Sequence, residues 1–137
     1  MLAPRNHRTA TAIDLGTPES RARLARMVMR LFEHWQLSAG DQLNLLGLSP
    51  TSRALLSKYR RGEPLPGTRD LLDRVGWLLS IHKSLRLLYP YNEALRYSWA
   101  TRRNRQFDNL PPLDVMKEQG IIGIAKVARY LDYYRGI

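Results

Sequence analysis

The stretch SAGDQLNLLGLSPTSRALLSKYRR, residues 38–61, decides the fold. It predicts two short helices joined by a tight turn at Gly47, because glycine readily adopts the left-handed conformation that ends a helix. Ser38 is expected to cap the first helix, with Asp41 three positions on as in a capping box. Ser49 is expected to cap the second, with Pro50 at the first helical position, where no backbone donor is needed. The stretch therefore predicts a helix-turn-helix.

The second helix of this pair is basic and contains no acidic residue. Leu55, Leu56 and Tyr59 share one face of it and can pack against the protein. The other face can meet phosphates or base edges, with base contacts nearest its N-terminal end. The residues predicted to bind DNA are Thr51, Ser52, Arg53, Ser57, Arg60 and Arg61. Two alternatives stay open: a basic surface helix in an ordinary bundle, or a helix that packs on a second protomer while Arg102, Arg103, Arg105 or the N-terminal arm holds the DNA.

The charge of the chain points to a polyanionic partner. The 137 residues carry 22 Lys and Arg against 12 Asp and Glu, a formal net charge of +10. Residues 53–105 contain twelve basic and four acidic residues, whereas residues 106–137 contain four of each. Basic clustering steers nucleic acid by long-range attraction and counterion release. The middle of the chain is therefore suited to an anion and the C-terminal segment is not.

Helical periodicity extends over the rest of the chain and predicts an all-α fold. Thr17 and Pro18 start a helix with an apolar stripe, and a longer helix runs from Thr68 towards Pro90. These apolar stripes comprise Leu24, Met27, Val28, Leu31, Phe32 and Trp35 in the first helix, and Leu71, Leu72, Val75, Leu78, Leu79, Leu85 and Leu88 in the second. Whether Gly76 or Ser80 interrupts the second helix cannot be read from the sequence. We expect a disordered arm at 1–16, a helix-turn-helix domain at 17–89 and a smaller helical domain at 90–137.

The C-terminal part is expected to form short helices around a loop. A helix from about Asn92 to Arg102 buries Leu95 and Trp99 and exposes Arg96. Residues 104–112 read as an ordered loop, followed by one or two helical turns, a stop at Gly120 and a last helix over 121–135. Tyr130, Tyr133 and Tyr134 gather there beside Arg129 and Arg135. Aromatic residues and arginine dominate protein–protein contacts, so Tyr133 is expected to contact a partner, while Tyr134 can equally close the core.

The sequence offers no catalytic or cofactor-binding pattern. It has no cysteine, no phosphate-binding glycine loop and no serine elbow, and its three histidines lack metal-ligand spacing. Asp70 and Asp73 are expected to pair with Arg69 and Arg74 along one helix. No apolar run approaches the roughly 20 residues that a transmembrane helix needs. We expect a cytoplasmic protein without enzymatic activity, metal or cofactor.

Three segments together resemble the MbcA/ParS/Xre antitoxin family. They are LFEHWQLS at 31–38 and LLGLS at 45–49, followed by RRGEPLP at 60–66. The agreement continues through RDLLDRVG at 69–76 and IHKSLR at 81–86, and through Trp99, Asn104, Phe107, PLDVM at 112–116 and YLD at 130–132. Arg103 and Asn109 depart from the pattern, which often has proline and glycine at these places.

The resemblance implies an antitoxin of a type II toxin–antitoxin system. It implies a self-associating all-α protein, a RES-domain toxin that consumes NAD or transfers ADP-ribose as partner, and operator DNA as a second partner. The C-terminal end would plug the NAD site of the toxin through Tyr134, Arg135, Gly136 and the Ile137 carboxylate, with Arg129 and Tyr133 beside it. Trp99, Asn104 and Phe107 would shape the domain beneath. A helix-turn-helix repressor whose C-terminal domain only oligomerises is the alternative, and an NAD-related enzyme is disfavoured.

Overall fold

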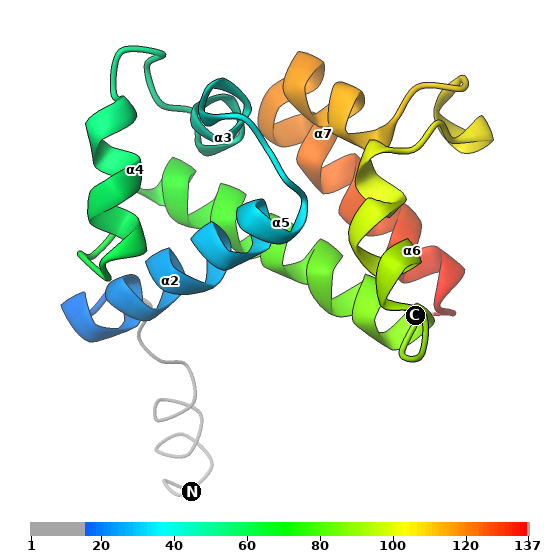
Figure 1. Ribbon diagram of the computed structural model, residues 1–137, viewed down its shortest axis with the longest axis horizontal. Helices are drawn as coiled ribbons and strands as arrows, with labels where there is room; N and C mark the ends of the chain where they lie inside the picture. Colours follow the sequence, from blue (N-terminus) through cyan, green and yellow to red (C-terminus); the bar gives the residue numbers. More distant parts are fainter. Residues whose placement is uncertain (1–15, 137) are drawn as a thin grey trace, which may run out of the picture.

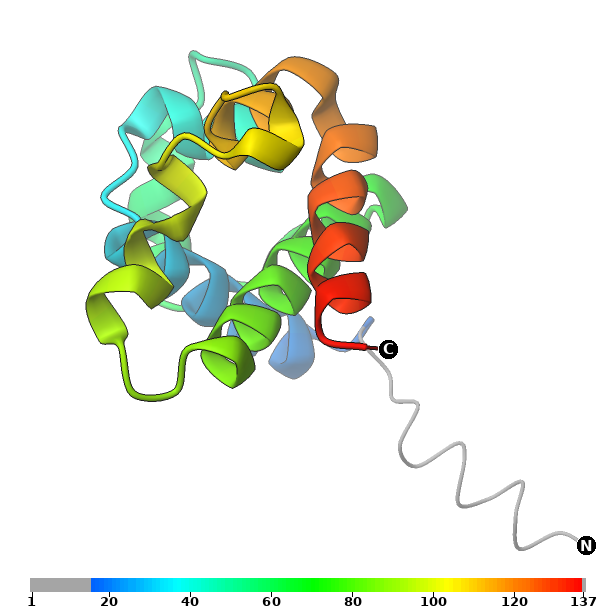
Figure 2. The same cartoon turned by 90° about the vertical axis from the view of Figure 1, so that its right-hand side faces the viewer.

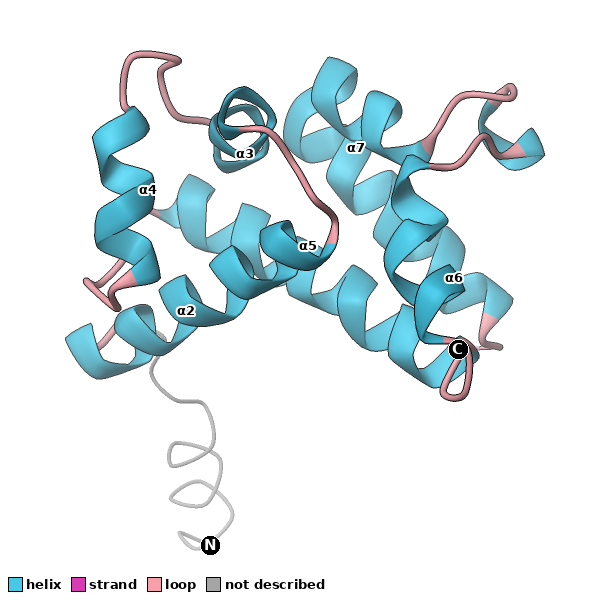
Figure 3. Cartoon of the chain, in the orientation of Figure 1, coloured by secondary structure: helices cyan, strands magenta, loops and turns pink. Residues whose placement is uncertain are grey.

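The computed structural model describes residues 16–136, and within them the fold is all-α, as predicted. The elements in chain order are α2 (Pro18–His34), α3 (Ala39–Leu46), α4 (Arg53–Arg60), α5 (Arg69–Leu88), α6 (Glu93–Ser98), the 3₁₀ turns η1 (Trp99–Thr101) and η2 (Arg105–Phe107), and α7 (Pro112–Tyr134) (Figures 1 and 3). No strand occurs in this part of the chain, where Asn104 and Leu110 form an isolated antiparallel bridge. The predicted arm, apart from Gly16, lies outside the described residues.

Helices α2 to α5 form the N-terminal unit, and α2 and α3 begin with the expected side-chain caps, whereas Thr68 at the start of α5 makes no side-chain cap hydrogen bond. The Thr17 Oγ1 accepts a hydrogen bond from the Ser20 amide at 3.1 Å, and the Ser38 Oγ accepts one from the Asp41 amide at 3.1 Å. Gly47 ends α3 with φ of 71°. Helix α5 continues without a break past Gly76 and Ser80. The helix-turn-helix is thus made of α3 and α4, with α2 packed against α4 (Figure 1).

The predicted start of the second helix of the pair is wrong by three residues. Helix α4 begins at Arg53, with Ser52 rather than Ser49 at the cap position and no side-chain cap hydrogen bond. The Ser49 Oγ instead accepts from the Thr51 amide at 3.2 Å and bonds to the Thr51 hydroxyl at 2.8 Å. Serine followed by proline is equally suited to a turn, because the hydroxyl bonds to the backbone two residues on and proline fixes φ. Here the turn wins.

Two other expectations about exposure are also wrong. Met27 belongs to the apolar stripe of α2 by spacing, yet 47% of its surface is exposed, while Ala25 and Met29 are buried instead. Arg96 is half-buried rather than exposed. Its guanidinium donates to the carbonyls of Tyr89 and Pro90 at 3.2 and 2.9 Å and lies 5.5 Å from the ring centre of Tyr97. This arginine fixes the bend between α5 and α6.

Helix α7 is broken at Gly120, as the sequence predicts. Gly120 has φ of 66° and ψ of −144°, which is not helical, so α7 consists of two helical pieces meeting at this residue. The second piece packs along α5 (Figure 2). One continuous hydrophobic core joins the two halves of the molecule, and α5 and α7 both contribute to it. Each half would expose part of this core to solvent if the other half were removed.

The loop between α6 and α7 keeps a glycine-like backbone without glycine. Asp108 and Asn109 have φ of 57° and 64°, in the left-handed region. Asparagine and aspartate tolerate this region better than other residues with a side chain. Asn109, one of the two departures from the family pattern, thus adopts the conformation that a glycine would adopt.

Candidate functional site

The exposed face of α4 brings together the residues predicted to bind DNA. Leu56 and Tyr59 are buried against the body of the protein, and burial, aided by the Glu63 carboxylate, raises the pKa of the Tyr59 hydroxyl. The residues predicted to bind DNA are exposed, except Ser52, which is half-buried; they are Thr51, Arg53, Ser57, Arg60 and Arg61. The Arg60 guanidinium donates to Ser57 Oγ at 3.0 Å, and Arg61 pairs with Glu63 at 3.5 Å. The face can present cations to a polyanion.

The C-terminal end of α7 presents two tyrosines to solvent. Tyr133 is 81% exposed and Tyr134 is 61% exposed. Arg129 and Gly136 are also exposed, whereas Ile137 lies outside the described residues. An exposed aromatic pair at a helix end can enter a pocket of a partner protein, because aromatic side chains bury a large area on contact.

Arg135 differs from the other residues predicted to bind the toxin at this end, because its side chain is attached to the body of the protein. Its Nη1 donates to Ser84 Oγ at 2.9 Å and lies 3.6 Å from the Asp132 carboxylate. Ser84 lies on α5, is fully buried, and donates to Asp132 Oδ1 at 3.4 Å. The last turn of α7 is therefore fastened to α5. The sequence gives no signal for Ser84, since its partners stand 48 and 51 residues away.

An aromatic chain leads from the core of the C-terminal half to this end. Trp99 and Phe107 are buried and meet edge to face, with ring centres 6.5 Å apart. Tyr130 stacks between Trp99 and Tyr134, with centres at 6.4 and 6.0 Å. Asn104 accepts the Gln106 amide at 2.9 Å and so shapes the turn that holds Phe107. These residues can support a contact surface, but Trp99 and Phe107 offer little surface of their own.

Three tyrosine hydroxyls crowd together at the outer end of the aromatic chain. Burial raises the pKa of Tyr130, and the Tyr134 and Tyr89 hydroxyls raise it further. The pKa of Tyr89 is raised by burial and then by Tyr134. Both shifts favour the neutral phenol, which can donate a hydrogen bond as well as accept one.

A salt bridge links the helix-turn-helix to the C-terminal half. The Lys117 ammonium on α7 lies 2.9 Å from Asp41 Oδ1 on α3. Nearby, Arg74 on α5 donates to Asp70 at 2.9 Å, as predicted, and also to the Leu45 carbonyl at 3.3 Å. Asp41 was expected to serve the cap of α3, and its contact with Lys117 could not be read from local spacing. The Lys117–Asp41 pair therefore attaches α3 to α7, and the Arg74–Leu45 hydrogen bond attaches α3 to α5.

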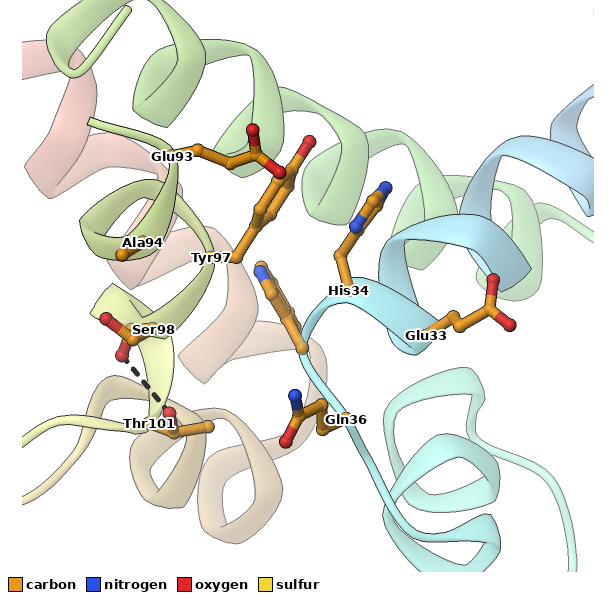
Figure 4. A pocket seen from close by; sticks show the side chains of 9 residues that line it. Glu33, His34, Gln36, Glu93, Ala94, Tyr97, Ser98 and Thr101 are labelled. Carbon is orange, nitrogen blue, oxygen red and sulfur yellow. Dashed lines mark hydrogen bonds between the residues drawn. The ribbon is translucent and has the colours of Figure 1, made fainter. Parts of the chain in front are cut away.

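A cleft of about 600 Å³ lies between the end of α2 and α6 (Figure 4). His34 and Tyr97 stack at its wall, with ring centres 4.0 Å apart. The ring centre of His82 lies 6.0 Å from that of Tyr97. Within residues 16–136 no three histidine or carboxylate side chains gather as a metal site would require. No helix in the same range combines the length and apolarity needed to cross a bilayer.

Comparison with known proteins assigns both halves. Residues 14–80 match the antitoxin Xre-like helix-turn-helix domain, and residues 84–136 match the antitoxin Xre/MbcA/ParS C-terminal toxin-binding domain. A relative from Sinorhizobium fredii (strain NBRC 101917 / NGR234), described as uncharacterized protein y4oB, is 37% identical over 107 residues, which cover 78% of this chain and 80% of the relative. The chain therefore belongs to the Xre/MbcA/ParS antitoxin family and is an antitoxin with a helix-turn-helix and a toxin-binding domain.

Proposed function

We propose that this antitoxin neutralises a RES-domain toxin by placing its C-terminal end in the NAD site of that toxin, and that it represses its own operon through α4. The identity of the toxin rests on the family resemblance, which extends from about Met27 to the C-terminus. The same resemblance supports a regulator that acts by binding rather than by catalysis. In this proposal the two halves of the molecule have separate partners.

The observation that carries the proposal is the exposed aromatic end of α7 held firmly in place. Tyr133 and Tyr134 point their surface to solvent, while the Arg135–Ser84 hydrogen bond fastens the same turn to α5. A preorganised group loses less conformational entropy on binding than a frayed terminus. This end can therefore enter a pocket at low entropic cost.

Toxin inhibition is tested with variants of this end, co-expressed with the toxin encoded beside the antitoxin gene. A chain ending at Asp132 and the variant Tyr133→Ala/Tyr134→Ala should both fail to protect cells. The double variant keeps Arg135 and so keeps the attachment to α5. Tyr91→Ala is the matched control, since Tyr91 is a 99% exposed tyrosine that is not part of α7. Full protection by the double variant and by the truncated chain would contradict the proposal.

Operator binding is tested by band shifts on the promoter of the antitoxin gene. Arg53→Ala should weaken binding by about 1 to 3 kcal/mol if the side chain reads a base, and adding Arg60→Ala should weaken it further. Arg69→Ala is the control, because its side chain is 94% exposed on another helix. Unchanged affinity of the Arg53→Ala/Arg60→Ala variant would rule out this face.

We also propose that the antitoxin is at least a dimer, since operators bound by helix-turn-helix proteins commonly mirror a two-fold axis of the protein. Trp77 and Tyr89, both half-buried at the surface of α5 and its end, are candidates for the contact. Light scattering at micromolar concentration should give a multiple of 15.9 kDa. A stable monomer would contradict the proposal. If no toxin gene lies beside this one, a repressor whose C-terminal domain only oligomerises becomes the better account.

A further inference from the structure

A groove of about 470 Å³ runs between α2 and α5, and none of the residues that line it belongs to α4 or α7. Arg23, Arg26 and Arg30 stand along its α2 side, and Arg86 stands on its α5 side. Met27 on α2 and Leu79 on α5 also line it. The spacing of three and four residues along α2 places these side chains on one helix face.

The four arginines have no anionic partner among the described residues. None of them forms an ion pair or a hydrogen bond within residues 16–136, and no carboxylate lines the groove. All four are exposed. Like charges that converge on one space repel one another unless an anion lies between them. The groove is therefore electrostatically suited to a negatively charged occupant.

The apolar part of the groove restricts what that occupant is. Met27 exposes 47% of its surface, and Leu79 beside it is half-buried. Methionine adapts its shape to apolar partners and is over-used at binding surfaces. A phosphate backbone gains nothing from such a surface, whereas a protein segment with apolar residues between acidic ones matches both features of the groove.

We propose that the α2–α5 groove binds an acidic amphipathic helix of another protein. The stretch of α2 from Arg23 to His34 that lines the groove is about 16 Å long, which accommodates about three turns of helix. Apolar residues of the incoming helix would contact Met27 and Leu79, and its flanking carboxylates would pair with the arginines on both sides. This inference does not depend on the proposed function.

Two other possible occupants of the groove, a second copy of this chain and its own residues 1–15, do not match the positive charge of the groove. A second copy of this chain brings the same four arginines to the contact, so a symmetric pairing through this groove would be repulsive. The chain's own residues 1–15 carry Arg5, Arg8 and His7 against Asp14, and so have the same sign as the groove. An acidic segment from a different protein has the complementary charge.

The test measures binding of a labelled synthetic peptide to the full chain by fluorescence anisotropy at physiological salt. The peptide spans about three helical turns, with leucines on one face and glutamates flanking them. A second peptide has the same composition in scrambled order. We expect saturable binding of the patterned peptide, about tenfold tighter than the scrambled one. Hydrogen exchange should slow at residues 23–34 and 79–86.

Variants assign the binding to the groove. Arg30→Glu/Arg86→Glu and the milder Arg30→Gln/Arg86→Gln should each weaken the patterned peptide about tenfold or more. Lys83→Glu, an exposed change on the same helix outside the groove, should alter binding less than twofold. Absence of saturable binding, equal affinity for both peptides, or an equal effect of Lys83→Glu would overturn the inference. Protection of residues 23–34 by duplex DNA alone would overturn it in favour of a phosphate contact.

Discussion

Ser84 shows how one buried hydroxyl fixes the C-terminal end of the molecule. It accepts from Arg135 and donates to Asp132 while being fully buried on α5. Ser84→Ala should lower the free energy of unfolding by about 1 to 2 kcal/mol, because it removes the hydrogen bonds that the hydroxyl makes to Arg135 and Asp132. Urea unfolding measures the loss. Ser80→Ala, a half-buried serine on the same helix whose hydroxyl makes no hydrogen bond in the described part of the chain, should change stability by less than about 0.5 kcal/mol. Equal losses in the two variants would contradict the role of Ser84.

His82 should make the stability of the fold depend on pH. Burial lowers the pKa of its imidazole below 6.5, and the charges of Arg86, His34 and Arg96 lower it further, while its Nδ1 is buried and has no hydrogen-bond partner within residues 16–136. Below pH 6.5 the unfolded chain therefore binds a proton that the folded chain resists, so the stability present above pH 6.5 falls as the pH falls through the folded pKa. Urea unfolding at pH 7.5 and pH 5.5 should show the loss. In His82→Gln the difference between the two pH values should shrink, and an unchanged difference would exclude His82 as its source.

The sequence predicts individual residues well where local spacing decides their place. The exposed set on α4, including Arg53 and Arg60, follows from helical period alone, and the capping by Ser38 follows from its short reach. Lys117 and Ser84 could not be identified, because their partners lie far along the chain and only the packing of α7 brings them together. Helical periodicity predicts that Met27 is buried, as it correctly does for Val28 and Leu31, yet Met27 is exposed. Periodicity identifies an apolar stripe but does not show which of its residues another helix covers.

At the scale of elements, replacing a glycine by alanine should have opposite effects on stability in α5 and in α7. Gly120 breaks α7 with φ of 66°, a conformation that side chains rarely adopt, so Gly120→Ala should lower the free energy of unfolding by about 1 to 3 kcal/mol. Gly76 lies inside helix α5, and a Cβ added there meets nothing within 4 Å. Gly76→Ala should raise the free energy of unfolding by about 0.5 to 1 kcal/mol. Thermal and urea unfolding of the pair measure both signs, and destabilisation by Gly76→Ala would show that the space beside it is needed for another purpose.

The boundaries of elements were predicted where one residue type has a single favoured role. Gly47 and Gly120 both break helices as expected, since a left-handed backbone favours glycine. The start of α4 was predicted wrongly, because Ser49 followed by Pro50 is equally suited to a helix start and to a turn. The packing of α4 against α2, which local sequence does not show, favours the later start. The division of α7 from α6 follows from the loop expected over residues 104–112, while the 3₁₀ turns η1 and η2 have no distinct sequence signal.

At the scale of the whole molecule, the helix-turn-helix and the toxin-binding domain should unfold as one cooperative unit. Leu78, Ile81 and Leu85 of α5 share one core with Ile124 and Leu131 of α7, and Lys117 pairs with Asp41 across the two halves. Removing either half would expose this apolar surface to water, which is costly in proportion to its area. Urea transitions followed by circular dichroism and by tryptophan fluorescence should therefore coincide, because Trp35 and Trp99 report on opposite halves.

A shortened chain gives the sharper form of this prediction. A chain ending at Tyr89 keeps every helix of the helix-turn-helix unit but leaves the α7 side of α5 uncovered, so it should lose its cooperative transition and its specific operator binding. The Arg53→Ala variant of the full chain is the matched comparison, because it should lose operator affinity while keeping the native unfolding transition. If the chain ending at Tyr89 unfolds with the stability of the full chain, the helix-turn-helix is an independent domain, and occupation of α7 by a toxin would have no route through the shared core to the DNA-binding face.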